Sequence, residues 1–506
     1  MKKEGKEKFF WSDQIADEII KRNKNKKVYT CASGITPSGK IHIGNFREII
    51  TTDLVVKALE KKGKKVRFIY SWDDFDRFRK VPSNLPENKK KEFESYIGMP
   101  LSEIPSPFDK KKSYAEYFEK EFEKTSKKVG VNPEFIYQNI MNKKHKYAPL
   151  MKKAIDNRKK IIKILNRYRK EPLKENWMPV EVYCNKCKKD YTKIKNVKNY
   201  EIEYECSCGF NEKIDYRKKG YVKMKWRVDW PARWHYEKVD FEPGGADHSA
   251  AGGSFETGKQ IIKEVYNDIA PAYNLYEWIT VKGIALKDFH SSKGNTMSIQ
   301  EVEDIYEPEI LRYLFVSTRP NKAFQISFDN DVIKIYDEFD SLENKYYEGL
   351  ANPQEKRIYE LSKLDITKEK PKRINFRHLI TLVQTGKIGK LKGIEKIRSE
   401  KVVKWLEKYA DDDMKFEVQD KVNIDLTEKQ KQALVALKES LAVKDFNEDE
   451  LFNEFYNICK AVGIEGKEFF KTAYNIIINK NKGPRLASLI LAIGKEKIIK
   501  LLNQIK

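Results

Sequence analysis

Thr36-Pro-Ser-Gly-Lys-Ile-His-Ile-Gly-Asn45 joins an expected strand at 28–32 to an expected helix that begins near Gly44. One face of that helix is apolar at helical spacing and carries Phe46, Ile49, Ile50 and Leu54. A glycine-bearing turn that leads into a helix N-terminus suits an anion, because free amides and the helix dipole both favour negative charge. His42 is placed to add a side-chain donor. The stretch therefore predicts a nucleotide phosphate site, although glycines in such links also serve as plain tight-turn residues.

A second strand is expected at 66–71, shortly after this helix. Strand, helix and strand over this length form a parallel crossover, the beginning of a doubly wound, Rossmann-type α/β sheet. Asp73, Asp74 and Asp76 follow the second strand directly. Carboxylates at the carboxyl end of a parallel strand lie where such sheets bind ligands. Loop capping and local ion pairs are the alternative explanation.

The charge balance favours a polyanionic partner. The chain has 506 residues, a net charge of +24 and a pI near 9.3. Such an excess points to nucleic acid, whereas a lysine-rich proteome would produce it without any partner. The length predicts several domains. No run approaches the ~18 apolar residues of a membrane span, and no apolar stretch follows the charged N-terminus. We therefore expect a cytoplasmic protein that does not bind membranes.

Four of the six cysteines cluster in two short knuckles, C-x2-C and C-x-C, that are 18 residues apart: Cys184, Cys187, Cys206 and Cys208. In a cytosolic chain this spacing indicates metal binding before disulfides. A hairpin between the knuckles would bring four thiolates to one tetrahedral ion, so we expect a closed structural Zn²⁺ site. Four reduced, unliganded thiols are the alternative. Cys31 and Cys459 are isolated, and we expect them to be packed.

Further elements follow the cysteines. Strands are expected at 221–229, 239–245 and 277–281, and a helix at 254–267. From residue 300 onward the pattern is helical, and Thr427 with Gln430 forms a capping box.

Two short signatures resemble those of class I aminoacyl-tRNA synthetases. His42-Ile-Gly-Asn45 matches the HIGH signature with Asn in place of the last His, and Ser291-Ser-Lys-Gly-Asn295 matches the end of the KMSKS region. Four longer segments look like those of the class I lysyl-tRNA synthetases, a mainly archaeal family: Gly34-Ile-Thr-Pro-Ser-Gly39, Tyr70-Ser-Trp-Asp-Asp-Phe-Asp-Arg77, Asp229-Trp-Pro-Ala-Arg-Trp234 and Phe241-Glu-Pro-Gly-Gly-Ala-Asp-His248. The likeness covers most of residues 25–350.

The resemblance implies a Rossmann-type catalytic domain with a zinc-binding insertion, followed by an all-α C-terminal anticodon-binding region. We expect the catalytic domain at 1–99 and 216–300, the insertion at 100–215, a stem-contact region at 301–355 and the anticodon-binding domain at 356–506. The implied activity is activation of L-lysine by ATP with Mg²⁺, followed by transfer of lysine to the terminal adenosine of tRNA(Lys).

The resemblance also assigns residues. The implied catalytic residues are His42, Asn45 and Lys293. The implied ATP-binding residues are Pro37, His42, Gly44, Asn45, Gly245, Asp247, Ser292 and Lys293. The implied lysine-binding residues are Gly34, Thr36, Asp74, Trp226, Asp229 and His248. The first two KMSKS positions read Asp288-Phe289 and the usual second lysine is Ser291, so Lys287 or Lys293 carries the positive charge.

The physical chemistry of lysine agrees with this assignment. A long cationic side chain needs an aromatic wall and a carboxylate partner, here Asp229 or Asp74. Three alternatives remain: a synthetase of the same fold for another amino acid such as glutamate, a small-molecule nucleotidylyltransferase, and a non-enzymatic protein that binds zinc and RNA. An acidic pocket disfavours the first, because glutamate needs a cation. The helical tail and the net charge disfavour the second, and two phosphate-contact segments disfavour the third.

Overall fold

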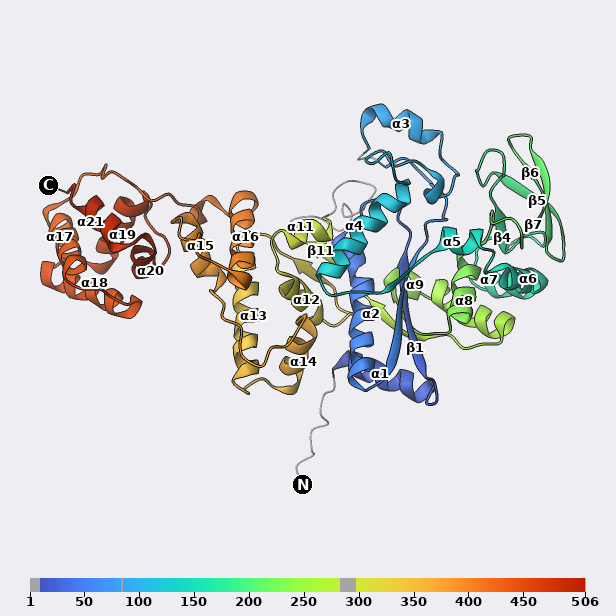
Figure 1. Ribbon diagram of the computed structural model, residues 1–506, viewed down its shortest axis with the longest axis horizontal. Coiled ribbons are helices and arrows are strands. Elements are labelled where there is room, and N and C mark those ends of the chain that lie inside the picture. Colours follow the sequence, from blue (N-terminus) through green and yellow to red (C-terminus); the bar gives the residue numbers. More distant parts are fainter. Residues whose placement is uncertain (1–9, 83–84, 283–296, 506) are drawn as a thin grey trace, which may run out of the picture. The chain divides into compact units, whose positions relative to one another are not determined.

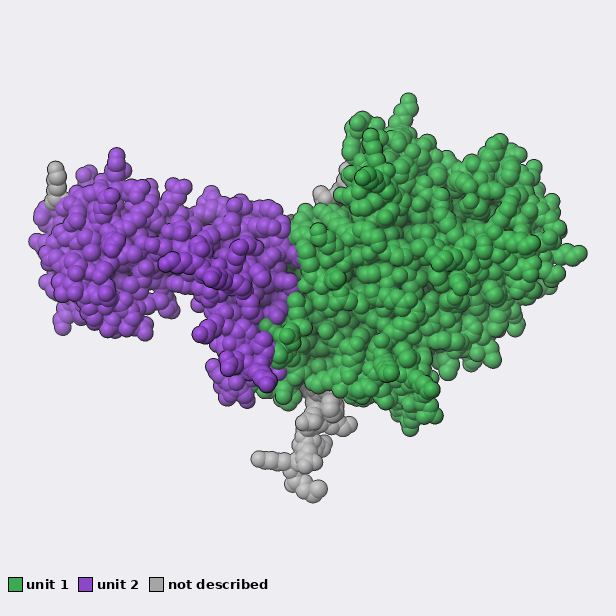
Figure 2. Space-filling model, in the orientation of Figure 1, with its two compact units in different colours: residues 1–302, 311–326, 351–366 green, residues 303–310, 327–350, 367–506 purple. Residues whose placement is uncertain are grey.

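The computed structural model describes residues 10–82, 85–282 and 297–505. The chain forms two compact units (Figure 2). Unit 1 comprises residues 1–302, 311–326 and 351–366, and unit 2 comprises residues 303–310, 327–350 and 367–506. Within the described ranges, no helix is both long and apolar enough to cross a membrane.

A five-stranded parallel sheet forms the centre of unit 1 (Figure 1). Its strand order is β10 (Ala272–Tyr276), β9 (Val239–Gly245), β1 (Val28–Ile35), β2 (Lys65–Trp72) and β3 (Glu134–Tyr137). The crossover from β1 to β2 runs through α2 (Ile43–Lys61), which begins within one residue of the expected position. This arrangement confirms the predicted Rossmann-type domain.

Apolar side chains on both partners fix α2 and the N-terminal helix α1 (Trp11–Arg22) against the sheet. Tyr29 and Cys31 of β1 pack with Ala16 and Ile19 of α1 and with the Val55–Leu59 stretch of α2. Each of the four named side chains is fully buried. The expectation that Cys31 is packed is therefore confirmed.

The strand expected at 221–229 is wrong in most of its length. Residues Val222–Met224 (β8) form an isolated antiparallel pair with β4 (Val180–Val182), and helix α8 (Trp226–Glu237) begins directly afterwards. Trp226, Trp230 and Trp234 recur every four residues, which is helical spacing. Tryptophan and valine also favour strands, so local propensity indicated a strand here. Tertiary packing overrides this preference, and the segment folds as a helix.

The strand expected at 277–281 is present only at residues 279–281, and it does not belong to the main sheet. The sheet receives β10 (Ala272–Tyr276), while β11 (Ile279–Val281) pairs with β12 (Phe324–Ile326) in a separate two-stranded sheet. The helix expected at 254–267 is present as α10 (Ser254–Ile261) followed by a π-helical turn, Ile262–Tyr266.

The segment between β2 and α8 carries most of the remaining elements of unit 1. These are α3 (Glu87–Glu94), a 3₁₀ turn (Leu101–Glu103), α4 (Tyr114–Lys128), α5 (Gln138–Lys143), α6 (Ala148–Asp156), α7 (Arg158–Asn166) and the antiparallel strands β5 (Thr192–Lys198), β6 (Glu201–Cys206) and β7 (Asn211–Asp215). Two further helices of unit 1 are α9 (Ala246–Ser249) and α14 (Pro353–Ser362). Figure 1 shows α6 and α7 beside β4–β7, and these elements share one apolar core.

Unit 2 is helical, as expected. Its helices are α13 (Asp331–Tyr347), α15 (Phe376–Gln384), α16 (Gly393–Lys408), α17 (Glu428–Val443), α18 (Glu448–Val462), α19 (Gly466–Ile478), α20 (Leu486–Ile493) and α21 (Lys495–Leu502), with a 3₁₀ turn at Asp412–Met414. The short helices α11 (Ile299–Glu303) and α12 (Pro308–Val316) each have residues in both units. Thr427 and Gln430 form the predicted capping box at the start of α17.

Two buried arginines hold the late segments of unit 1 in place. Arg312 is fully buried and pairs with Asp53 of α2 at 2.7 Å, while it donates to the backbone oxygens of Val129 and Leu361. Arg357 of α14 pairs with Asp13 of α1 at 2.8 Å. Because a buried charge is costly without its partner, these pairs specify where residues 311–316 and 351–366 belong.

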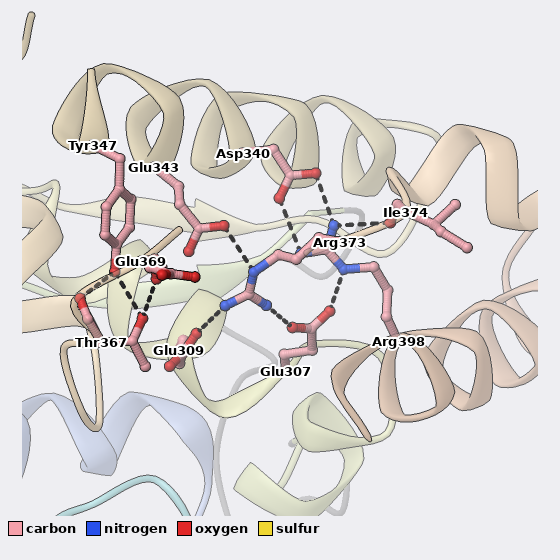
Figure 3. A network of polar contacts seen from close by, with 10 residues as sticks. All are labelled: Glu307, Glu309, Asp340, Glu343, Tyr347, Thr367, Glu369, Arg373, Ile374 and Arg398. Atoms are coloured by element: carbon pink, nitrogen blue, oxygen red, sulfur yellow. Dashed lines mark hydrogen bonds and ion pairs between the residues drawn. The ribbon is translucent and has the colours of Figure 1, made fainter. Parts of the chain in front are cut away.

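Two other buried arginines hold the three segments of unit 2 together. The carboxylate of Glu307 lies between them, at 3.0 Å from Arg373 and 2.5 Å from Arg398 (Figure 3). Arg373 also contacts Glu309 and Glu343, and Arg398 also binds Asp340 through both terminal nitrogens. Residues from 303–310, 327–350 and 367–506 therefore meet in one ionic network.

The expected stem-contact region at 301–355 is divided between the units, because residues 311–326 and 351–355 belong to unit 1. The two units are a coarser division than the five parts expected from the sequence. Those five boundaries therefore stay a prediction.

Arg398→Met is expected to destabilise unit 2 by about 3–5 kcal/mol, because it leaves Asp340 without its buried counter-charge and Glu307 with Arg373 alone. Amide hydrogen exchange in α13 and α16 measures this directly, and both helices should exchange faster. The matched control is Arg377→Met, which removes an arginine that is 66% exposed and pairs with Asp337; its effect should stay within about 0.5 kcal/mol. Equal exchange in both variants would contradict the role of the network.

Candidate active site

His42 is the N-cap of α2, so the predicted phosphate turn does end at a helix N-terminus. The side-chain oxygen of Asn45 accepts a hydrogen bond from the backbone N–H of His42 at 3.3 Å, which closes the first turn. Ile43 donates its N–H to Met297, and His42 bridges to Ser298. The residues directly after the KMSKS-like segment therefore lie beside this turn. Ser292 and Lys293, with Lys287, Asp288, Phe289 and Ser291, lie outside the described residues.

Gly34 is the second-last residue of β1 and lies where no side chain fits. A Cβ at this position would lie 2.5 Å from the backbone oxygen of Ser71 on β2. The N–H of Gly34 donates to the carboxylate of Glu48 at 2.9 Å, and the hydroxyl of Tyr276 donates to the other oxygen at 2.6 Å. Burial raises the pKa of Glu48 to about 8, and the nearby carboxylates of Glu242 and Asp73 add to the rise. The two hydrogen bonds lower the pKa but do not offset the effect of burial.

Thr36 lies at the carboxyl end of β1 and donates to Asp76 at 3.0 Å. Asp76 in turn receives a hydrogen bond from Lys223 of β8. Pro37 is buried in the turn that follows. The predicted residue Thr36 is thus held by a carboxylate that already has a cation.

The structure brings Trp226 and His248 together. Their ring centroids are 5.9 Å apart, and Trp230 lies 5.3 Å from Trp226 and 5.6 Å from His248. The indole N–H of Trp226 donates to Ser254 at 3.3 Å. These rings make the aromatic wall that a long aliphatic side chain needs.

Arg233 is the central cation of this region. It lies on α8 and pairs with Asp73 at 2.7 Å and with Asp229 at 3.2 Å. Burial raises the pKa of Asp229 to about 6 although Arg233 opposes the rise. The predicted residue Asp229 therefore has a positive partner within the protein.

Asp74 contacts α5 and not Arg233. It is fully buried and accepts hydrogen bonds from the backbone and side chain of Asn139 on α5. Burial raises its pKa to about 7. These contacts tie β2 to the start of α5 and do not involve α8 or α9, which carry Trp226 and His248.

Carboxyl groups outnumber cations at this edge of the sheet. Glu242 of β9 is buried, accepts from the indole of Trp234 at 2.6 Å and has a pKa raised to about 7 by burial. Together with Asp73, Asp76, Asp229 and Glu48 it makes five carboxylates. Arg233 and Lys223 are the two cations that the described residues place in contact with them.

Gly245 and Asp247 lie where β9 turns into α9, next to His248. The Asp247 side chain is 64% exposed and lies 3.9 Å from the His248 ring nitrogen. Ser249 bonds to the hydroxyl of Tyr273 on β10 at 2.6 Å. The two predicted residues are therefore at the carboxyl end of the strand adjacent to β1.

The four clustered cysteines have the geometry of a tetrahedral metal site. Cys184 and Cys208 have sulfurs 3.7 Å apart, those of Cys187 and Cys206 are 3.6 Å apart, and all four lie within 4.8 Å of one another. Tetrahedral Zn²⁺ with Zn–S bonds of about 2.3 Å separates its sulfurs by about 3.8 Å. The donor set and its spacing therefore fit zinc.

Sequence reasoning missed Glu48, Arg233, Glu242 and Tyr276 as parts of this site. No local signal marked Glu48, because it lies about 200° around α2 from Phe46, opposite the apolar stripe, where a charged residue is ordinary. Arg233 stands four residues after Asp229, which is ion-pair spacing on a helix, but the strand expected at 221–229 includes Asp229 and hides this spacing.

Comparison with known proteins gives consistent results. The family described as tRNA synthetases class I (K) matches residues 9–365, and an anticodon binding domain matches residues 400–506. Three relatives are named lysine–tRNA ligase. The protein of Borreliella burgdorferi is 42% identical over 98% of this chain and 99% of its own length. That of Pyrococcus horikoshii is 38% identical over 97% and 99%, and that of Methanocaldococcus jannaschii is 36% identical over 97% and 99%.

Proposed function

The chain belongs to the family of class I tRNA synthetases for lysine, and from that premise we propose how its residues bind the substrates. It functions as a lysine–tRNA ligase, an enzyme that activates L-lysine with ATP and Mg²⁺ and transfers it to tRNA. It also carries an anticodon-binding domain. We propose that it acts in the cytoplasm on tRNA(Lys).

The excess of carboxylates at the carboxyl edge of the sheet is the observation that carries the specificity. A lysine side chain would add the missing positive charge beside the aromatic wall of Trp226, Trp230 and His248. A glutamate side chain would add a sixth carboxylate where Arg233 is already shared by Asp73 and Asp229. The same pocket therefore disfavours the alternative synthetase for glutamate.

We propose that Glu48 binds the ε-ammonium of lysine together with Tyr276. Asp229 is paired with Arg233, and Asp74 is buried against Asn139, whereas the polar contacts of Glu48 are neutral donors. Gly34 and Thr36 would hold the amino-acid end of the substrate, near the helix N-terminus where the reaction takes place.

The nucleotide is proposed to bind across the carboxyl ends of β1 and β9. His42, Gly44 and Asn45 would contact its phosphates at the start of α2, and Pro37, Gly245 and Asp247 would contact the remainder. The lysine carboxylate attacks the α-phosphorus in line, and pyrophosphate leaves. Ser292 and Lys293 stay predicted partners of the leaving group. Positioning and charge stabilisation supply the catalysis, because both reactants bring their own charge.

We propose that Cys184, Cys187, Cys206 and Cys208 hold one structural Zn²⁺. Four protein ligands close the coordination sphere, so the ion would stabilise the insertion and would take no part in the reaction.

ATP–pyrophosphate exchange in the presence of tRNA tests the function and the role of Glu48. We expect exchange with lysine and none with glutamate. Glu48→Gln should raise the KM for lysine by at least about 30-fold, since losing one partner of a desolvated charge pair costs about 2–5 kcal/mol. The KM for ATP should change little.

Asp229→Asn is the matched control for this variant. It removes the same charge but leaves Arg233 paired with Asp73, so its effect on the KM for lysine should be smaller. If Asp229→Asn has the larger effect, Asp229 is the partner of the ammonium. Stimulation of exchange by glutamate instead of lysine would refute the assignment of the substrate.

Lysine affinity is expected to rise with pH between about 7 and 8.5. The pKa of Glu48 is raised to about 8, so its carboxyl group is mostly protonated at pH 7. The ε-ammonium, with an ordinary pKa near ~10.4, stays charged and favours the ionised carboxylate. Binding therefore releases a proton at pH 7, and the release should vanish above about pH 9.

Isothermal titration of lysine into the enzyme–tRNA complex, in buffers of different ionisation enthalpy, measures the released protons. Glu48→Gln should remove most of the release. Equal proton release in the variant and the parent would assign the titration to another group.

Metal analysis of the purified protein should find one zinc per chain. Cys184→Ser/Cys206→Ser should lose it and unfold the insertion at a lower temperature, because the remaining two thiolates cannot hold the ion. Cys459→Ser changes a buried cysteine in unit 2 and serves as the control with full zinc content. A double variant that retains its zinc would disprove the site.

A further inference from the structure

Three consecutive residues at the carboxyl edge of the sheet are each held by a residue from the region that carries the clustered cysteines. Phe75, Asp76 and Arg77 lie shortly after the end of β2. We call residues 180–224, which comprise strands β4–β8 and the four clustered cysteines, the cysteine lobe. The lobe contacts all three residues. It therefore determines the position of one short backbone segment of the catalytic half.

Tyr183 holds the first of the three residues. Its hydroxyl donates to the backbone oxygen of Phe75 at 2.9 Å, and the two rings meet edge to face with their centroids 5.2 Å apart. Both side chains are 1% exposed. Tyr183 directly precedes Cys184, and its backbone N–H donates to Tyr221 at 2.9 Å. One short stretch of the lobe thus carries both a cysteine and this contact.

Asp190 holds the third residue. Its carboxylate lies 3.2 Å from the guanidinium of Arg77, which also lies over the ring of Tyr191. The Asp190 side chain is 10% exposed, and its backbone N–H donates to Gly98 at 2.9 Å. A Cβ at Gly98 would lie 3.1 Å from Asp190 and from Tyr191. The ion pair is therefore packed closely against residues 97–99.

Asp76, between these two contacts, connects the lobe to the proposed substrate site. It accepts hydrogen bonds from Thr36 at 3.0 Å and from Lys223 of β8. Lys223 also lies 3.6 Å from Glu181 of β4. Thr36 is the residue proposed above to hold the amino-acid end of lysine. Its position therefore depends on a carboxylate that the lobe fixes directly and through both of its neighbours in the chain.

We propose that Tyr183 and Asp190 are positioning residues for lysine activation. By holding the backbone on either side of Asp76, they determine where Thr36 meets the amino-acid end of the substrate. This inference rests on the proposed function, because it takes Thr36 as a contact of lysine. In-line attack tolerates little misplacement, and a shift of about 1 Å can cost about 10²-fold in rate. The cysteine lobe thus contributes to activation without touching the reactants.

ATP–pyrophosphate exchange at saturating tRNA tests the proposal with the double variant Tyr183→Phe/Asp190→Asn. This variant loses one hydroxyl and one charge and keeps the four clustered cysteines. Its kcat/KM for lysine should fall at least about tenfold, because Thr36 is no longer held in place. The KM for ATP, the Kd for tRNA and the zinc content should stay at the parent values. An unchanged kcat/KM for lysine, or a loss confined to tRNA binding, would overturn the proposal.

Inhibition by n-pentylamine separates the two ends of the substrate. This amine keeps the ammonium and the methylenes of the lysine side chain but lacks the amino-acid end. Its inhibition constant should be the same in the double variant and the parent, because the lobe acts through Thr36. An increase that matches the loss for lysine would contradict positioning at the amino-acid end. Glu48→Gln should raise the inhibition constant, and its failure to do so would refute the proposed ammonium site without affecting the result for the lobe.

Tyr216→Phe/Asp215→Asn is the matched control in the same lobe. Tyr216 is 2% exposed and donates its hydroxyl to the backbone oxygen of Asn199 at 3.0 Å, and Asp215 pairs with Arg217 at 2.7 Å. The control thus loses the same two groups from contacts that do not involve residues 75–77. Its kcat/KM for lysine should stay within about twofold of the parent. An equal fall in the control would assign the effect to the stability of the lobe and overturn the proposal.

Arg77→Gln completes a double-mutant cycle with Asp190→Asn. Each single variant should lower kcat/KM for lysine. The combination should lower it no further than the larger single change, because both variants remove the same ion pair. Fully additive losses would show that the two residues act separately and would contradict the proposed role of Asp190.

Discussion

An excess of buried carboxyl groups over cations at the carboxyl edge of the parallel sheet is the constraint on which this site depends. Carboxylates from α2, β9, α8 and the end of β2 converge there, and two of them share the single positive charge of Arg233. Because desolvated like charges repel, such a cluster persists when the surrounding fold fixes it or when a cation joins it. The tight contact of β1 with β2 at Gly34 and the tryptophan-rich helix α8 supply that fixation. A cationic amino acid, as proposed above, would supply the positive charge that this cluster lacks.

The elements that the sequence predicted well are those whose local pattern and tertiary role agree. The β1–α2 turn combines strand, glycine and amphipathic helix signals, and the cap of α17 needs two residues in register. The knuckle spacing of the cysteines likewise fixes their convergence, which the sulfur distances confirm. In each case the information lies within about twenty residues.

What the sequence could not supply depends on contacts between distant residues. Glu48 has its partners in β1 and β10, the latter 228 residues away, and no local pattern pairs them. The first turn of α8 falls within the strand expected at 221–229, because its aromatic residues also favour strands. Among the proposed lysine ligands, Trp226 and His248 come together as expected, whereas Asp74 and Asp229 have protein partners that only the folded chain reveals.

The interleaving of the two units has a consequence for synthesis on the ribosome. The chain passes between the units five times after residue 302, and unit 1 receives its last segment at residues 351–366. Asp13 of helix α1 can therefore form its ion pair only after Arg357, 344 residues later in the chain, has been synthesised. Contacts over such separations form slowly because loop closure precedes them. The catalytic half should thus remain incomplete until residue 366 of 506 has been made, and a nascent chain cut short at the insertion that carries the four clustered cysteines would expose much of its apolar surface to chaperones.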